Sequence, residues 1–80
     1  MTVRVLLFAR YRETAGTDRL DLHLSPGTTL GAVWEEVARR VPALGVESAP
    51  LMAVDQSYAR ADQRIDTDCE VAFFPPVSGG

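Results

Sequence analysis

The sequence predicts one α+β domain, in which a single main helix packs on one face of a mixed β-sheet. Its 80 residues supply apolar side chains for one core only. Hydrophobic residues make up 46% of the chain and charged residues 24%, and a formal net charge of −3 is too small to keep such a chain unfolded. Several short segments alternate in the manner of strands, and one segment between them has helical spacing. This order of elements favours the α+β class.

The first element is a predicted strand over residues 2–9 with apolar side chains on both faces. One face carries Val3, Val5, Leu7 and Ala9, and the other carries Leu6 and Phe8. A strand of this kind lies in the middle of a sheet, or has one face on the core and the other on a partner protein. Residues 10–17 are polar and predict one helical turn or a loop. Residues 20–24 alternate leucines with polar residues, which predicts a second strand paired with the first in a hairpin.

The main helix is predicted over residues 30–41. Thr28 and Thr29 precede it and offer hydroxyl groups that can accept hydrogen bonds from its first amides. Its apolar positions follow the spacing of one helix face: Leu30, Val33, Trp34, Val37, Ala38 and Val41. On the other face, Glu35 and Glu36 each stand four residues before an arginine, an order that favours ion pairs. Pro42 ends the helix because its ring cannot continue the helical hydrogen bonding.

The second half of the sequence predicts a connector and three short strands. Residues 42–50 contain two prolines and a glycine and form the connector, either irregular or with a single turn at residues 44–46. The strands are expected over residues 51–54, 58–60 and 70–74. Pro75 and Pro76 then end the ladder because proline has no amide hydrogen. We therefore expect a folded domain over residues 1–74 and an extended tail over residues 75–80.

Composition disfavours several classes of protein. The longest apolar run, residues 5–9, is far shorter than the roughly 20 residues that cross a bilayer, so we expect no membrane span. The first residues lack the pattern of a secretory signal. A single cysteine, Cys69, cannot form an internal disulfide, which fits a reducing compartment, and we expect a cytoplasmic protein. The acidic balance argues against a nucleic-acid partner.

Side-chain catalysis has little support in the sequence. His23, the one histidine, stands on the polar side of a predicted strand, without a visible partner for acid–base work. Asp66, Asp68 and Glu70 lack the spacing of a calcium loop and are interpreted as a solvated turn, so we expect no metal site. Cys69 has no neighbouring histidine or second cysteine, which favours a small half-buried residue over a redox or sulfur-relay role.

The C-terminal residues offer a different kind of chemistry. Pro75 and Pro76 stiffen the chain where it leaves the predicted last strand, and Gly79 and Gly80 make its end thin enough to enter a narrow channel in another protein. A pair of terminal glycines is otherwise a frayed end. If the tail does enter such a channel, the α-carboxylate of Gly80 is the reactive group.

The ending of the chain resembles a known family. The residues that carry the resemblance are Val71-Ala72-Phe73-Phe74-Pro75-Pro76-Val77-Ser78-Gly79-Gly80, with Leu7-Phe8-Ala9 and Arg12-Glu13 near the start. Together they are similar to the MoaD family of ubiquitin-like sulfur carriers, the small subunits of molybdopterin synthase. The resemblance covers essentially the whole chain and implies the ubiquitin-like β-grasp fold, with a mixed sheet of four to five strands. The chain departs from the family at Asp68, which stands where the family usually has a glycine.

The resemblance implies that this chain is a sulfur donor without catalytic side chains of its own. An E1-like adenylyltransferase would use ATP and magnesium to adenylate Gly80, and a desulfurase or rhodanese would supply the sulfur of a thiocarboxylate. The large subunit would hold the catalytic groups, in a heterotetramer of two small and two large subunits, where the sulfur passes to cyclic pyranopterin monophosphate. Val77, Ser78 and Gly79 would form the threaded part of the tail. No cofactor is expected to stay bound to this chain.

The strands with apolar side chains on both faces are then expected to take part in docking. Phe8 and Phe74 are expected on the sheet face opposite the helix, with Tyr58 as a neighbour and Arg12 and Glu13 at the polar rim. The alternative is that this face belongs to the core. Two alternatives to the function also stay open: a sulfur carrier for tRNA thiolation, thiamine or cysteine synthesis, and a ubiquitin-like protein modifier or simple interaction domain.

Overall fold

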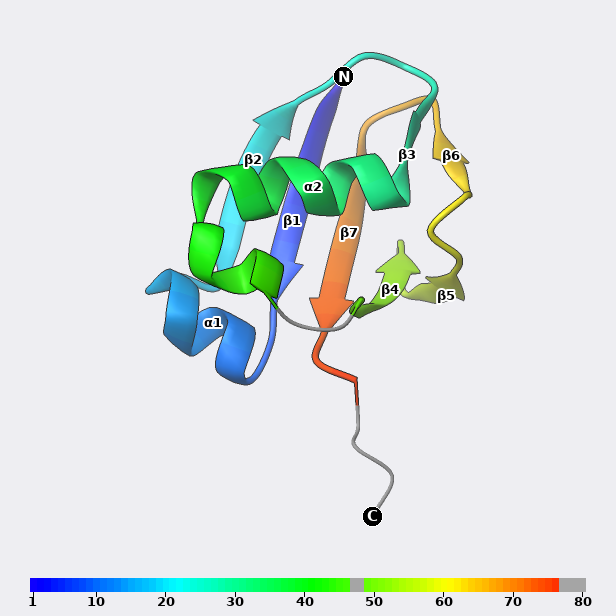
Figure 1. Cartoon of the computed structure of the whole chain (residues 1–80). Helices are drawn as coiled ribbons and strands as arrows, with labels where there is room; N and C mark the ends of the chain where they lie inside the picture. The colour runs from blue at the N-terminus through cyan, green and yellow to red at the C-terminus, as the bar shows by residue number, and fades with distance from the viewer. Residues whose placement is uncertain (47–48, 77–80) are drawn as a thin grey trace.

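The structure is a computed structural model that describes residues 1–46 and 49–76 (Figure 1). Five strands form one mixed sheet in the order β2-β1-β7-β4-β5. Their bounds are β1 (Thr2–Leu7), β2 (Arg19–His23), β4 (Leu51–Val54), β5 (Ser57–Ala59) and β7 (Cys69–Phe74). The helix α2 (Leu30–Arg40) crosses one face of this sheet (Figure 1). The predicted α+β fold, with one main helix on a mixed sheet, is confirmed.

The two strands with apolar residues on both faces lie in the middle of the sheet, as predicted for the first. β1 pairs in antiparallel fashion with β2 and in parallel with β7, and β7 pairs in antiparallel fashion with β4. The predicted hairpin of β1 and β2 is therefore confirmed. Because β1 and β7 run in the same direction, their carboxyl ends meet at one edge of the sheet (Figure 1). This edge is where Phe8 and the exit of the chain from β7 lie together.

The segment after β1 is a short helix, α1 (Arg10–Ala15), where the sequence predicted one helical turn or a loop. β1 ends at Leu7 rather than at residue 9, since Ala9 has φ 54° and ψ −131°, which no strand residue adopts. Gly16, at φ 73°, ends α1 in the left-handed conformation that glycine accepts without steric cost. Tyr11 is buried, with its ring 5.1 Å from that of Trp34, so α1 is anchored to the core.

The first amides of α2 are satisfied from two sources. The backbone N–H of Ala32 donates to Oγ1 of Thr29 at 3.2 Å, which confirms one of the two predicted capping threonines. The N–H groups of Leu30 and Gly31 donate to the carbonyls of Gln63 and Ala61 at 3.0 and 2.9 Å. The start of the helix is therefore held by a distant loop as well as by its own cap.

This loop leads into a strand of a second, two-stranded sheet that the sequence did not predict. β3 (Thr28–Thr29) pairs in antiparallel fashion with β6 (Arg64–Ile65). Strands of two residues are too short to show an alternating pattern. The pairing depends instead on the turn at Gly27, at φ 92°, whose N–H donates to the carbonyl of Ile65 at 2.8 Å.

We expect the substitution Thr29→Ala to destabilise the domain by about 1 kcal/mol, because it leaves the Ala32 amide without its side-chain acceptor. Thr29→Ser keeps the hydroxyl group and is the matched control. Urea unfolding of the two variants at neutral pH measures the difference. Equal losses in both variants would show that the threonine methyl group, rather than the cap, stabilises this position.

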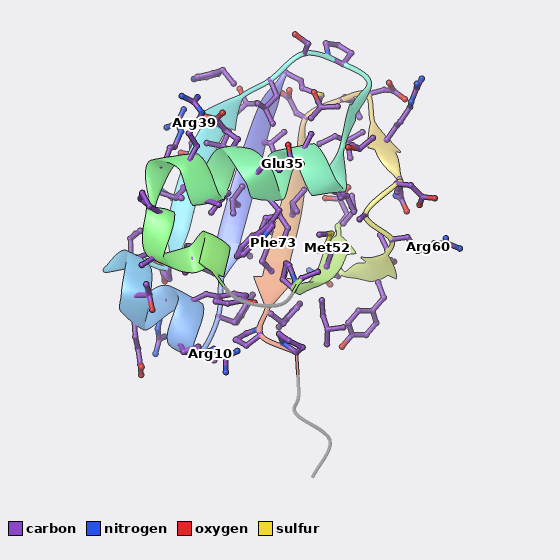
Figure 2. All side chains as sticks on the ribbon, in the orientation of Figure 1. Arg10, Glu35, Arg39, Met52, Arg60 and Phe73 are labelled. Atoms are coloured by element: carbon purple, nitrogen blue, oxygen red, sulfur yellow. The ribbon has the colours of Figure 1, made fainter. Side chains whose placement is uncertain are left out.

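The core lies between α2 and the sheet. Its members are Val3, Val5, Leu7, Tyr11, Leu22, Leu30, Val33, Val37, Leu44, Met52, Ile65, Val71 and Phe73. Figure 2 shows Phe73 and Met52 on the side of the sheet that α2 covers, and the two residues are direct partners in the pairing of β7 with β4. The predicted buried face of the helix is thus confirmed at Leu30, Val33 and Val37, while Trp34 is half-buried.

The connector after α2 contains a 3₁₀ helix, η1 (Pro42–Val46), so the single turn considered for residues 44–46 is present. Leu44 points into the core from it and is almost fully buried. None of the helices in the described part of the chain is long and apolar enough to cross a membrane.

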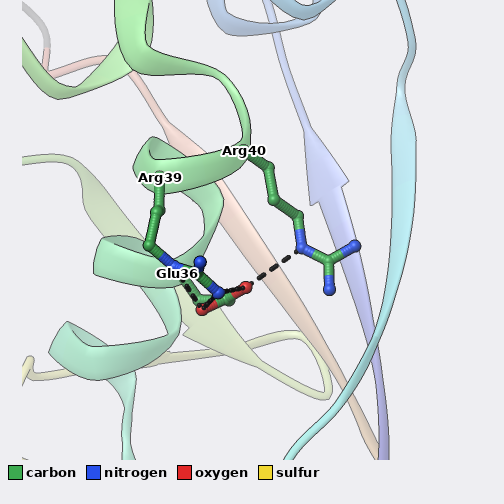
Figure 3. Close-up of polar contacts among 3 residues, drawn as sticks. All are labelled: Glu36, Arg39 and Arg40. Atoms are coloured by element: carbon green, nitrogen blue, oxygen red, sulfur yellow. Dashed lines mark hydrogen bonds and ion pairs between the residues drawn. The ribbon is translucent and has the colours of Figure 1, made fainter.

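The exposed face of α2 carries a cluster of charges centred on Glu36 (Figure 3). Arg39 donates to Glu36 from both Nε and Nη2, at 3.1 and 2.7 Å, and Arg40 donates from Nε at 3.1 Å. The predicted pairing four residues apart thus forms for Glu36 and Arg40. Arg39 pairs with Glu36 rather than with Glu35. Glu36 and Arg39 are three residues apart, an interval that also brings two side chains together on a helix.

The Glu36 cluster should make the stability of the domain depend weakly on pH in the acid range. Hydrogen bonds from Arg39 and then Arg40 hold the pKa of Glu36 below its ordinary value of 4.5. A lowered folded-state pKa stabilises the fold above the unfolded-state pKa, and this contribution is lost as the pH falls through the folded-state pKa. We expect the melting temperature of Glu36→Gln to lie slightly below that of the parent chain at neutral pH, and the difference to shrink as the pH falls below 4.5. A constant difference across that range would contradict this origin.

Candidate functional site

The candidate site lies on the sheet face opposite α2, at the edge where β1 and β7 end. Phe8 follows β1 directly, and Phe74 is the last residue of β7. Their rings are stacked with centroids 4.6 Å apart and planes 13° apart. Tyr58, on β5, places its ring 6.4 Å from that of Phe74. The structure thus brings together the three aromatic residues that the sequence placed on this face.

The aromatic residues are exposed, and an aliphatic residue extends their surface. Phe8 is 40% exposed, Tyr58 is 80% exposed, and Leu51, which lies opposite Phe74 in the pairing of β4 with β7, is 44% exposed. We call the aromatic patch the following set, which lines a hollow of about 430 Å³ together with Ala9: Phe8, Leu51, Tyr58, Phe74, Pro75 and Pro76. Exposed aromatic and aliphatic side chains gathered in one place make this face the candidate interaction site. The alternative that this face belongs to the core does not fit the exposure of Phe8 and Tyr58.

Sequence reasoning missed Leu51 as a member of the aromatic patch. β4 has only four residues, and its two central ones, Met52 and Ala53, are both buried, so no clean alternation marks one face. Only the register against β7 places Leu51 beside Phe74.

The backbone at Ala9 sets the position of Phe8. Ala9 has positive φ with an extended ψ, a combination that costs a residue with a Cβ roughly 1–3 kcal/mol. The turn is held by the first bonds of α1, in which Tyr11 N–H donates to the Phe8 carbonyl at 3.1 Å and Glu13 N–H to the Ala9 carbonyl at 3.2 Å. The strained residue also lines the hollow of the aromatic patch, between Phe8 and α1 in the chain.

The remaining predicted site residues lie around or beyond this patch. Arg12 and Glu13 are exposed on α1, which begins two residues after Phe8, and their role as a polar rim stays a prediction. Pro75 and Pro76 are half-buried and leave the sheet from the end of β7 (Figure 1). The predicted tail residues Val77, Ser78, Gly79 and Gly80 lie outside the described residues.

The residues considered for side-chain catalysis are not assembled into a site. His23 is exposed, and its Nδ1 lies 3.4 Å from Oγ1 of Thr2. Oδ1 of Asp68 accepts a hydrogen bond from the Thr2 N–H at 2.7 Å, and Asp68 does not need the left-handed backbone that a glycine there would suggest. Within residues 1–46 and 49–76, no group of His, Cys, Asp and Glu side chains is arranged to hold a metal ion.

Cys69 is a poor candidate for redox or sulfur-relay chemistry. It is half-buried and packs against the core, as the sequence suggested. Burial raises the pKa of its thiol, and the nearby carboxylates of Asp55 and Asp68 raise the pKa further. A thiol in this environment stays protonated at neutral pH and is weakly nucleophilic.

Comparison with known proteins agrees with the geometry. Residues 5–80 match the ThiS family. The chain is 37% identical over 81 residues to the molybdopterin synthase sulfur carrier subunit of Escherichia coli (strain K12), covering 98% of this chain and 99% of that sequence. Among solved structures, a putative molybdopterin converting factor subunit 1 from Pyrococcus furiosus superimposes with a TM-score of 0.85 at 28% identity, covering 96% of this chain and 99% of that one.

A second solved structure shows how widely the fold is used. The small archaeal modifier protein 1 from Methanosarcina acetivorans superimposes with a TM-score of 0.78 at 28% identity, covering 99% of this chain and 96% of that one. The ubiquitin-like β-grasp fold predicted from the resemblance is therefore confirmed. Because the family match spans nearly the whole chain and a curated relative is more than 30% identical end to end, this chain belongs to the ThiS family, in which it is similar to the sulfur carrier subunits of molybdopterin synthase.

Proposed function

We propose that this chain is the sulfur carrier subunit of a molybdopterin synthase and that the α-carboxylate of Gly80 carries the sulfur as a thiocarboxylate. The observation that carries the proposal is the end-to-end match to the curated sulfur carrier subunit of Escherichia coli, within a family match that runs through Gly80. The exit of the chain from β7 beside an exposed aromatic patch supports it, because the partner that binds the patch also receives the tail.

Sulfur loading begins with activation of the carboxylate. A carboxylate is a poor electrophile, so an E1-like adenylyltransferase uses ATP and magnesium to join Gly80 to AMP and releases pyrophosphate. A desulfurase or rhodanese then supplies sulfur, which displaces AMP at the carbonyl carbon. When the sulfur arrives as a persulfide, a thiol reduces the resulting acyl disulfide and releases the thiocarboxylate.

Sulfur delivery takes place in the active site of the synthase large subunit. The tail of residues 75–80 enters that site, with Val77, Ser78 and Gly79 as its thin threaded part. The thiocarboxylate is ionised at neutral pH and attacks cyclic pyranopterin monophosphate, and water then returns the carboxylate of Gly80. Two carriers supply the two sulfurs of one dithiolene, in a heterotetramer of two small and two large subunits.

The aromatic patch docks both the activating enzyme and the large subunit, with Arg12 and Glu13 at its rim. Exposed aromatic residues clustered beside an aliphatic one are typical of the energetic centre of an interface. The catalytic side chains belong to the partners, and this chain requires no bound cofactor of its own.

Intact mass spectrometry tests the proposal. The chain is incubated with ATP, magnesium, an E1-like activating enzyme and a sulfur source, and the fragment containing Gly80 is then sequenced by mass. We expect the mass to change by the difference between one sulfur and one oxygen atom, with the change located at Gly80. An unchanged mass, with the same enzyme active on a control carrier, would rule the proposal out.

The same sample separates the alternatives. Addition of the large subunit and cyclic pyranopterin monophosphate should consume the thiocarboxylate and form the dithiolene. A thiocarboxylate that persists under these conditions would point to a carrier for tRNA thiolation, thiamine or cysteine synthesis. Conjugates with an isopeptide bond to target lysines, in the absence of a thiocarboxylate, would point to a protein modifier.

A further inference from the structure

A second hollow, of about 400 Å³, adjoins the aromatic patch on the same face of the sheet. Its floor is made by the methyl groups of two alanines, Ala53 on β4 and Ala72 on β7, which are direct partners in the strand pairing. Along the same row of the sheet, Leu6 lies opposite Ala72 and Tyr58 lies opposite Ala53. Two small side chains between two large ones leave a trough, which we call the alanine groove.

The two ends of the alanine groove differ in chemistry. At one end lie the stacked rings of Phe8 and Phe74, which belong to the aromatic patch. At the other end lie Glu70, one row nearer the start of β7, and Gln56. A partner that covers the aromatic patch therefore also covers the alanine groove, and it brings its own side chains close to Glu70.

Glu70 has no cation of this chain paired with it in the described residues. Arg4 lies opposite Glu70 in the pairing of β1 with β7, but its Nε pairs with Asp21 on β2, at 3.9 Å. On the other side, the backbone N–H of Glu70 donates to Oδ1 of Asp55 at 3.0 Å, which places a second carboxylate nearby. A half-buried carboxylate flanked in this way attracts a cation from outside the chain.

From this arrangement we infer that the alanine groove receives a long cationic side chain, arginine or lysine, from the protein that docks on the aromatic patch. The aliphatic stem of such a side chain packs on the methyl groups of Ala53 and Ala72, and its head reaches the carboxylate of Glu70. An apolar side chain fits the floor but leaves Glu70 covered and unpaired, which is unfavourable. The inference rests on the proposed function, since it names the group by which that partner is recognised.

Two kinds of variant test the alanine groove. Ala72→Leu fills the floor, and we expect it to weaken binding to the large subunit, the activating enzyme or both by about a hundredfold. Glu70→Gln keeps the shape and removes the charge, and we expect a loss of about tenfold with a smaller dependence of the affinity on salt. Glu35→Gln removes an exposed carboxylate from α2, on the opposite side of the molecule, and should bind like the parent chain. Calorimetric titration of each purified partner measures these affinities.

The outcomes separate this inference from the proposed function. The parent chain must first bind its partners and accept sulfur, and a failure there contradicts the proposed function itself. If the parent chain does both and the folded Ala72→Leu and Glu70→Gln variants bind equally well, the alanine groove receives no cation and only this inference is overturned. If Ala72→Leu does not fold, Glu70→Gln and the charge reversal Glu70→Lys test the inference instead. Residue 70 lies on the sheet face opposite α2, outside the core, so these two variants should fold. Unchanged affinity in both of these variants also overturns the inference.

Discussion

Deletion of Gly80 is expected to abolish sulfur loading, so that no thiocarboxylate is detected under conditions that convert the parent chain. The reason is steric and chemical. In the proposed reaction, the activating enzyme places the terminal carboxylate against the α-phosphate of ATP, and a tail that is one residue shorter would end about 3.5 Å before that point. Intact mass spectrometry before and after incubation with ATP, magnesium, activating enzyme and sulfur source measures the result.

Two controls show whether a loss of sulfur loading comes from the shorter tail or from damage to the folded domain. Asp66→Asn lies in an exposed turn far along the chain from the tail, and it should load sulfur like the parent chain. The Gly80 deletion should also keep the melting temperature of the parent, because the folded elements end at Phe74. Efficient thiocarboxylate formation on Gly79 of the shortened chain would show that the activating enzyme does not measure the length of the tail.

Substitution of Phe73 by alanine is expected to remove most of the stability of the domain. Phe73 is fully buried, and its ring centroid lies 4.9 Å from that of Trp34. Loss of a buried phenylalanine costs about 3–5 kcal/mol through lost burial and the cavity left behind. A domain of this size has about 5 kcal/mol of stability, so we expect the melting temperature to fall by about 20 °C or the chain to be largely unfolded.

The neighbouring substitution Phe74→Ala should affect binding to the partners more than the stability of the domain. Phe74 points to the other face of the sheet, where its ring stacks on Phe8, and its loss should cost the fold only about 1–2 kcal/mol. Its loss from the centre of the aromatic patch should weaken binding to the large subunit and the activating enzyme by about thirtyfold, which corresponds to roughly 2 kcal/mol. Thermal unfolding and calorimetric binding, measured on both variants, separate the two roles.

The paired variants act as controls for each other, since they change the same side chain at adjacent positions of β7. Phe8→Ala should reproduce the binding loss of Phe74→Ala because it removes the other half of the stack. If Phe74→Ala and Phe8→Ala stay folded and bind both partners normally, the aromatic patch is not a docking surface. Equal destabilisation by Phe73→Ala and Phe74→Ala would mean that both faces of β7 are packed in solution.

Most of the fold was predictable because its main elements carry long or strong local patterns. The helical spacing from Leu30 onward predicts both the helix and its buried face, and Pro42 predicts where it stops. Alternation over residues 2–9 and 70–74 predicts the two central strands, and the residues on their second face predict the exposed aromatic rings. Local sequence is informative in these segments because each one presents several side chains to the same face.

The parts that were missed depend on contacts between distant segments. The pairing of Thr28–Thr29 with Arg64–Ile65 involves strands of two residues, which leave no pattern to read. Leu51 joins the aromatic patch only through its register against Phe74. The backbone of Ala9 is set by its position between Leu7 in the core and the buried Tyr11, and nothing in the residue type indicates positive φ.

Local sequence was enough to predict the class of fold and the buried side of each main element, because periodicity and residue type act through neighbours along the chain. The chemistry proposed for Gly80 also starts from the sequence, through the resemblance of the chain's ending to the sulfur carriers. The order of the strands in the sheet became known only from the folded structure. The parallel pairing of β1 with β7 brings Phe8 onto Phe74, and the pairing of β7 with β4 sets Ala72 beside Ala53. Strand order and register depend on the free energy of the whole packed sheet, and a shift of one residue would turn these side chains to the other face.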